Sequence, residues 1–146
     1  MNVDVTVSKA RDFFKQHGYE LFFGQKSRYN TKREATDREV ILEPFPMRPS
    51  RSGVCAYDTN LTFWVGMRRS VDTKFRDNAD GQLTDWMQYM LSETSQLLMD
   101  LYHEDWVLIH QNINDIELRY YEADEAATVN SQSFIRFSIP VKLYVN

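Results

Sequence analysis

The sequence is poor in the residues that secreted, membrane-spanning and nucleotide-binding proteins need. Only one of its 146 residues is cysteine, Cys55, so no disulfide can form within the chain. The five glycines are scattered, whereas a loop that cradles phosphate needs several close together. No apolar run approaches the roughly 20 residues that cross a bilayer, and Met1 is not followed by the basic patch and apolar run of a signal peptide. We therefore expect an intracellular protein with no membrane contact and no cofactor.

Histidine is also scarce, which limits the possible metal and catalytic sites. His103 and His110 have acidic neighbours, but the segment between them changes from helix to strand character, so a solvated helix end is expected rather than a metal site. Cys55 follows the alternation of a strand core and is expected to be a packed thiol. Carboxylates after Tyr121 could serve as acid and base, but exposed carboxylates are poorly suited to proton transfer at neutral pH. We expect no metal, no catalytic residue and no enzyme activity.

The most regular pattern lies between residues 83 and 102. Apolar side chains recur there every three or four residues, as they do on one face of an α-helix. Asp80 precedes the pattern, where its carboxylate can accept a hydrogen bond from a free backbone N–H group. The sequence therefore predicts a long amphipathic helix over about 82–103. Its apolar face consists of Leu83, Trp86, Met87, Met90, Leu91, Leu97, Leu98, Leu101 and Tyr102.

Alternating segments flank this helix. Apolar residues share one parity between Cys55 and Met67, and again from residue 135 to residue 145, which is typical of strands with one buried face. A shorter pattern over residues 7–14 ends near Gly18, which suits the left-handed position after a helix. The predicted fold class is α+β: a mainly antiparallel twisted sheet, with the long helix and a short N-terminal helix packed on one face. The length and the 42% hydrophobic content predict a single domain over residues 1–146.

The charges are unevenly divided along the chain. Residues 26–76 hold eleven basic and six acidic side chains, whereas residues 77–146 hold three basic and twelve acidic. One interpretation is that solvated faces happen to segregate. The other is self-complementarity, in which the basic half of one copy contacts the acidic half of the next in a ring or filament. The exposed basic arm at about 25–38 also has the composition of a nucleic-acid contact, but protein contact is favoured because the chain is acidic overall.

These patterns give a set of candidate interface residues. Trp64 lies on the polar parity of its strand, so it is either covered by a second layer or available to a partner, and tryptophan is enriched at interface centres. The basic candidates are expected to contact acidic loops of an adjacent subunit. The full set is Arg28, Lys32, Arg33, Trp64, Arg68, Arg69, Asp124 and Glu125.

The order of the elements resembles the phage tail-terminator and tail-completion (neck) family. A long alternating strand (Tyr57 to Met67), a polar crossing, a helix opening with Leu83 and Trp86-Met87, and a strand ending in Tyr120-Tyr121 follow one another. An acidic loop and a final alternating strand complete the resemblance, which covers about residues 54–146. Residues 25–53 depart from it, because the basic arm and the proline-rich connector are longer than such proteins usually need.

The resemblance implies a virion structural protein that forms a homo-oligomeric ring at the phage tail or head-tail connector. Such a ring joins or caps tube layers around the DNA channel; it is part of the virion, and viral tail assembly takes place in the host cytoplasm. Its implied partners are copies of itself and adjacent tail-tube, portal or connector proteins, with non-specific contact to DNA in the lumen. No catalytic residues carry over from this family. The alternative is a small monomeric ligand-binding α+β domain that uses a pocket between helix and sheet.

Overall fold

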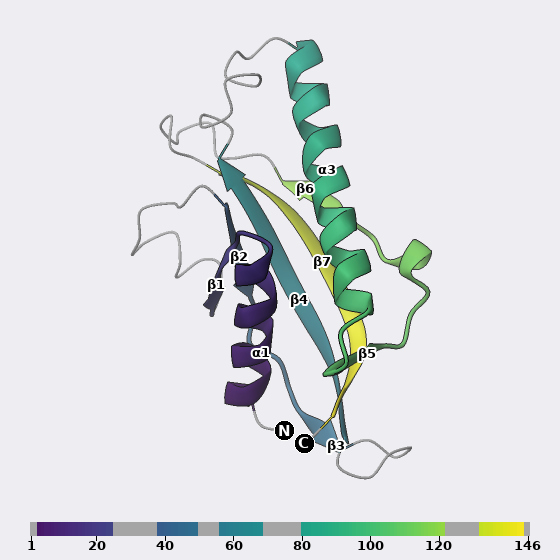
Figure 1. The fold of residues 1–146 in the computed structure, drawn as a ribbon. Coiled ribbons are helices and arrows are strands. Elements are labelled where there is room, and N and C mark those ends of the chain that lie inside the picture. Colours follow the sequence, from purple (N-terminus) through teal and green to yellow (C-terminus); the bar gives the residue numbers. More distant parts are fainter. Residues whose placement is uncertain (1–2, 25–37, 50–55, 69–79, 122–131, 145–146) are drawn as a thin grey trace.

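The computed structural model describes residues 3–24, 38–49, 56–68, 80–121 and 132–144 (Figure 1). Two α-helices, seven strands and one 3-10 helix occur in these ranges. In chain order they are α1 (Val3–Gln16), β1 (Glu20–Phe23), β2 (Arg38–Leu42), β3 (Arg48–Pro49), β4 (Ala56–Arg68), α3 (Asp80–Tyr102), β5 (Val107–Ile109), η3 (Ile113–Asp115), β6 (Arg119–Tyr121) and β7 (Gln132–Tyr144).

All seven strands belong to one sheet. Its strand order is β1-β2-β4-β7-β5, with β3 added beside β4 and β6 beside β7. The antiparallel pair β4–β7 forms its centre, in continuous register from Ala56 opposite Tyr144 to Arg68 opposite Gln132. The strands β5 and β6 pair with the same edge of β7 near its two ends.

The predicted fold class is wrong. The sheet is mixed rather than mainly antiparallel, because β1 runs parallel to β2, with Glu20 opposite Glu39 and Phe23 opposite Leu42. The helix expected over about 82–103 runs from Asp80 to Tyr102, and its first turns lie beyond the tip of β4 instead of on the sheet (Figure 1). The physical reason is that apolar spacing shows which face of an element is buried but not the direction of its neighbour.

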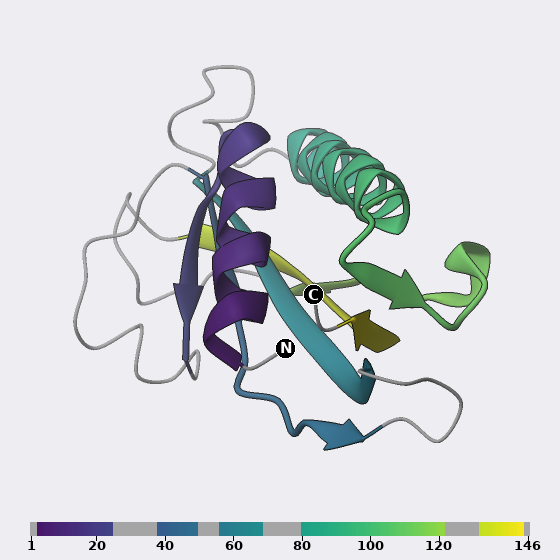
Figure 2. The ribbon, with the colours of Figure 1, turned by 60° about the horizontal axis from the view of Figure 1, so that its bottom comes forward.

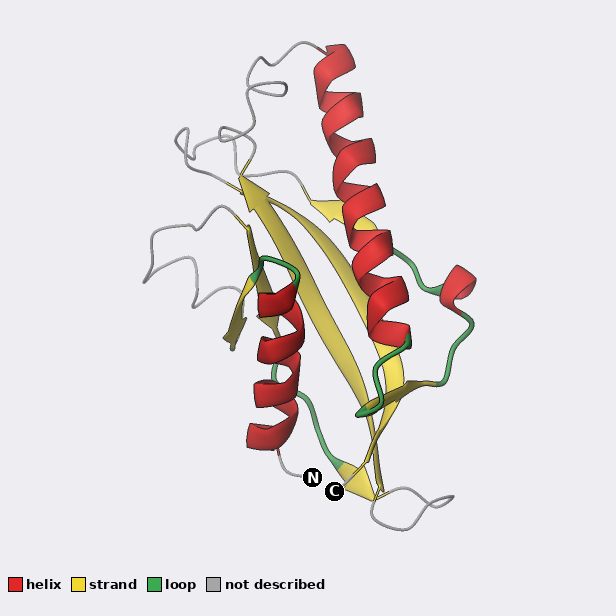
Figure 3. Ribbon diagram, in the orientation of Figure 1, coloured by secondary structure: helices red, strands yellow, loops and turns green. Residues whose placement is uncertain are grey.

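The core lies between the sheet and the two helices. Figures 2 and 3 show α1 and α3 on the same face of the sheet. On that face Phe14 of α1 contacts Phe63 of β4, with ring centroids 5.3 Å apart, and Phe63 contacts Phe137 of β7 at 5.4 Å. Trp86 of α3 is almost fully buried and donates its indole N–H to Ser133 Oγ at 3.3 Å. Rings from both helices and both central strands therefore form one continuous core.

The end of α1 is closed by Gly18, as the sequence predicted. Its φ of +85° is in the left-handed region, which glycine adopts without a steric penalty. The Tyr19 N–H donates to the Phe14 carbonyl at 2.9 Å and the Gly18 N–H donates to the Lys15 carbonyl at 3.1 Å. This is the Schellman arrangement, which satisfies carbonyls at a helix end and turns the chain directly into β1. Within the described ranges, neither helix combines the length and apolar character that crossing a membrane requires.

Candidate interaction surfaces

Most of the predicted interface residues lie outside the described residues. These are Arg28, Lys32, Arg33, Arg69, Asp124 and Glu125. Arg68 is the last residue of β4, where its backbone lies opposite Gln132. Trp64 is the one member of the set whose side chain is described. The expected contact between the basic residues and the acidic loop therefore stays a prediction.

Trp64 lies on the sheet face opposite the described helices. Its neighbours across the strands are Ile41 of β2 on one side and Arg136 of β7 on the other. Residues 61, 63, 65 and 67 of the same strand point into the core under the helices. Because successive side chains of a strand alternate between faces, Trp64 must point to the other face. We call it the open face only because neither described helix covers it; Ile41 and Phe134 on this face are buried, at 1% and 6% exposure.

Four side chains of the described residues contact the Trp64 ring. The indole N–H donates to Glu43 Oε1 at 2.8 Å. The ring centroid lies 5.0 Å from that of Tyr121 and 6.2 Å from that of Phe134. The Arg136 guanidinium lies 5.6 Å from the same centroid, within the range of a cation–π contact. We call these five residues the Trp64 cluster. Its half-buried tryptophan is held in one orientation before any partner binds.

Polar side chains lie on two sides of the Trp64 cluster, whereas the neighbour on β2 is the buried Ile41. The hydroxyl groups of Thr62 and Ser138 lie 2.9 Å apart across β4 and β7. Beyond Arg136, the exposed Arg119 pairs with Glu117 at 2.7 Å. An aromatic and arginine centre with a polar rim is the usual composition of a protein–protein contact surface.

On the helix side, Arg38 connects three elements. Its guanidinium donates to the hydroxyl oxygens of Tyr19, directly before β1, and Tyr89 of α3. It also lies 3.5 Å from the Glu93 carboxylate of α3. Burial raises the pKa of Tyr19 to about 12, although the positive charge of Arg38 acts in the opposite direction. The sequence prediction placed Arg38 at the end of the basic arm, but its shared parity with Val40 and Leu42 was a signal that it faces the helices.

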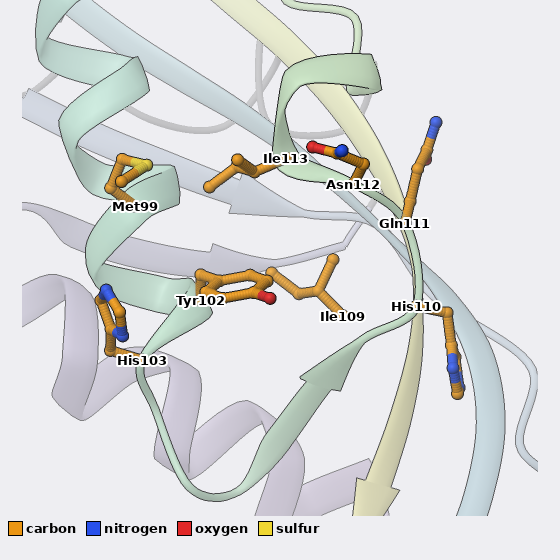
Figure 4. Close-up of a pocket in the computed structure, with 8 residues that line it drawn as sticks. All are labelled: Met99, Tyr102, His103, Ile109, His110, Gln111, Asn112 and Ile113. Atoms are coloured by element: carbon orange, nitrogen blue, oxygen red, sulfur yellow. The ribbon is translucent and has the colours of Figure 1, made fainter.

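An open groove of about 410 Å³ lies where the C-terminal end of α3 meets β5 and the chain that follows it. Figure 4 shows Met99, Tyr102, Ile109 and Ile113 around this groove, with His110 pointing away from them. The remaining lining residues are His103, Gln111 and Asn112. Met99 and Tyr102 are 44% and 48% exposed, which leaves an apolar surface open to solvent at this edge of the sheet.

Two histidines of the described residues each pair with one carboxylate. The two ring nitrogens of His17 lie 2.8 Å from the Phe13 carbonyl and 3.0 Å from Asp100 Oδ2. His110 lies 3.7 Å from Asp58 on the open face. In the ranges that the structure describes, histidine, cysteine and carboxylate groups form no cluster of three or more that could hold a metal ion. These pairs connect elements of the fold and do not converge on a shared site.

No family model matches this chain, and no curated protein matches it either. The open face and the groove therefore have to be interpreted from their own geometry.

Proposed function

We propose that this chain is a virion structural protein that forms a homo-oligomeric ring at a phage tail or head-tail connector. The observation that carries the proposal is the Trp64 cluster, a fixed aromatic and arginine centre on a sheet face that the described helices leave open. Tryptophan, tyrosine and arginine are the side chains that contribute most at protein–protein contacts. The element order that resembles the tail-terminator and neck family gives the second support.

In this proposal the protein acts by geometry. Copies join side by side with their helices outward and their open faces toward the channel. Where the open face meets the adjacent tail-tube, portal or connector protein, the Trp64 cluster supplies the contact, and Arg136 adds a positive charge beside the tryptophan ring. The ring joins or caps tube layers and keeps the channel open. Such a role needs no reacting group and no cofactor.

Charge complementarity between copies supplies a first test. Arg68 and Arg69 are proposed to contact acidic residues near Asp124 and Glu125 of the next copy. Replacing both arginines by glutamate should impair assembly without unfolding the domain, as judged by circular dichroism. If the doubly reversed protein assembles like the wild type at physiological salt, this pairing is wrong.

Native mass spectrometry over a concentration series, with negative-stain microscopy of the same samples, tests the ring itself. A single closed oligomer with a central channel is the expected result. A protein that stays monomeric at every concentration, and also in the presence of the tail-tube protein encoded beside its gene, would refute the proposal. Neighbouring genes for portal, tail-tube or tape-measure proteins would support it.

The groove at the end of α3 favours a second candidate function. A monomeric ligand-binding domain was the alternative from sequence, and a volume of about 410 Å³ is within the roughly 300 to 1,000 Å³ of small-molecule sites. The groove lies at the sheet edge rather than between the length of α3 and the sheet. Saturable binding of an apolar fluorescent probe to monomeric protein, abolished by Met99→Lys, would favour this candidate.

A further inference from the structure

We infer that copies of this chain join by their sheet edges, with β5 of one copy pairing antiparallel with β1 of the next and Phe23 inserted into the groove. The inference rests on the proposed ring function and deepens it, because it adds a backbone contact between copies to the proposed charge contact. It starts from the strand order, in which β1 and β5 are the two ends of the sheet. Among the described strands each of them pairs on one side only.

The outer edge of β5 carries backbone groups that point away from β7. The His110 N–H donates to the Pro140 carbonyl at 3.0 Å, and antiparallel pairs exchange hydrogen bonds at every second residue. Leu108, opposite Lys142, is therefore the residue of β5 that bonds to β7. The N–H and C=O groups of Val107 and Ile109 point to the other side, where an added strand can reach them.

The outer edge of β1 is arranged in a matching way. The Gly24 N–H donates to the Leu42 carbonyl at 3.0 Å. In a parallel pair the backbone N–H and C=O groups of every second residue point to the partner strand, so those of residues 20, 22 and 24 point to β2. Phe22 is one of these residues. The backbone groups of Leu21 and Phe23 point away from β2. Each end of the sheet thus presents two residues with outward N–H and C=O groups.

Strand direction makes the two edges compatible. β1 is parallel to β2, and the steps from β2 to β4, β4 to β7 and β7 to β5 are each antiparallel. Three reversals leave β5 antiparallel to β1. A neighbour in the same orientation therefore presents its β1 antiparallel to β5, which is the pairing that short strands form most readily. Because the same contact repeats at every copy, it generates a ring when the rotation closes.

The side chains at the two edges also fit. Phe23 is 41% exposed and shares the parity of Leu21, which faces the helix layer, and its ring lies 6.0 Å from that of Phe45 in the core. The groove lies on the helix side as well, since Met99 and Tyr102 come from α3. In a continued sheet, Phe23 of the next copy therefore points to the side on which the groove opens, and its ring covers the exposed apolar surface there.

Two exposed positions test this contact without disturbing the core. Phe23→Lys and Met99→Lys each place a charge in the proposed contact, and each should lower the association constant between copies at least tenfold in native mass spectrometry. The matched control is Ser95→Lys, an exposed position one turn earlier on the same helix, which should assemble like the wild type. Circular dichroism and thermal melting check that all three variants fold.

Cross-linking tests the geometry directly. In a Cys55→Ser background, chains with Phe23→Cys are mixed with chains carrying Met99→Cys and oxidised. A disulfide dimer should form in the mixture and in neither sample alone. The control pairs Met99→Cys with Val5→Cys, since Val5 is as exposed as Phe23 but lies on α1.

The outcomes separate this inference from the ring proposal. Loss of assembly in both lysine variants but not in the control, together with the specific cross-link, supports the edge contact. Closed wild-type oligomers that persist in both lysine variants overturn the edge contact and leave the ring proposal intact. A wild-type protein that stays monomeric under every condition overturns both.

Discussion

Replacing Arg38 by methionine tests whether the bridge between β1, β2 and α3 stabilises the fold. The substitution keeps a long unbranched side chain but removes the donors to Tyr19 and Tyr89 and the charge beside Glu93. A hydrogen bond from a charged group contributes about 1.5 to 3 kcal/mol when buried, and an exposed ion pair about 1 kcal/mol or less. The Arg38 and Glu93 side chains are 36% and 42% exposed, so solvent screens both contributions.

After this reduction we expect a loss of about 2 kcal/mol in the free energy of unfolding. For a domain of this size that corresponds to a melting temperature lower by about 4 to 8 °C. The assay is urea unfolding followed by tryptophan fluorescence, where the midpoint should fall while the slope of the transition stays constant.

The matched control is Arg119→Met. Arg119 is exposed and pairs with Glu117, two residues away, so it connects no distant elements. Its midpoint should equal that of the wild type. If Arg38→Met also unfolds at the wild-type midpoint, the bridge does not stabilise the fold and the reasoning is refuted.

Three further predictions concern one residue each. Burial raises the pKa of Tyr19 from 10.0 in the unfolded chain to about 12. The contribution of Tyr19 to stability is therefore complete below pH 10 and is lost as the pH rises toward 12. Tyr19→Phe should reduce the fall in the urea midpoint between about pH 9 and pH 11. Phe63 is fully buried between Phe14 and Phe137, so Phe63→Ala should cost about 3 to 5 kcal/mol in urea unfolding, and a cost below that of an exposed substitution would contradict the described core. Trp64→Ser should weaken binding to the adjacent virion protein at least tenfold in a pull-down while the isolated domain keeps its far-UV spectrum, and unchanged binding would remove the open face from the proposal.

The central pair of strands could be predicted from sequence because its signal is local. Every second residue is apolar from Leu61 to Met67 in β4 and from Ile135 to Leu143 in β7. The structure confirms that Leu61 and Phe63, like Phe137 and Ile139, are fully buried. The position of Gly18 was predictable for the same reason, since a helix end depends on a few adjacent residues. Apolar periodicity and helix ends can be predicted from sequence because they depend on residues that are close together in the chain.

The parallel pairing of β1 with β2 was not predictable in this way. The apolar residues of both strands show only that one face is buried, and the segment between them is long enough for either a hairpin or a parallel connection. The predicted sheet was mainly antiparallel, and β1 with β2 is the pair that departs from it. Arg38 was missed for a related reason: its partners Tyr19 and Tyr89 lie 19 and 51 residues away, and no local pattern connects them.

The candidate surface was predicted only in part. The parity of β4 placed Trp64 on the polar side, but its hydrogen bond to Glu43 and its ring contact with Tyr121 depend on the strand register. Pro140, which has no N–H to donate, lies in the part of β7 between the residues paired with β6, which end at Arg136, and those paired with β5, which begin at Val141. The sequence alone does not show that β7 has this gap along one edge.

The pairing of β4 with β7 also determines how this chain must fold. Its register joins residues between 64 positions apart, at Arg68 and Gln132, and 88 positions apart, at Ala56 and Tyr144. Contacts of such long range form slowly, because chain entropy is lost before they are made, so refolding is expected on a scale of about milliseconds to seconds. Turns of α3 can form within about a microsecond, long before this ladder closes. Until it does, the apolar side of that helix has no sheet to cover it, and this interval is when the unassembled polypeptide is most prone to aggregate.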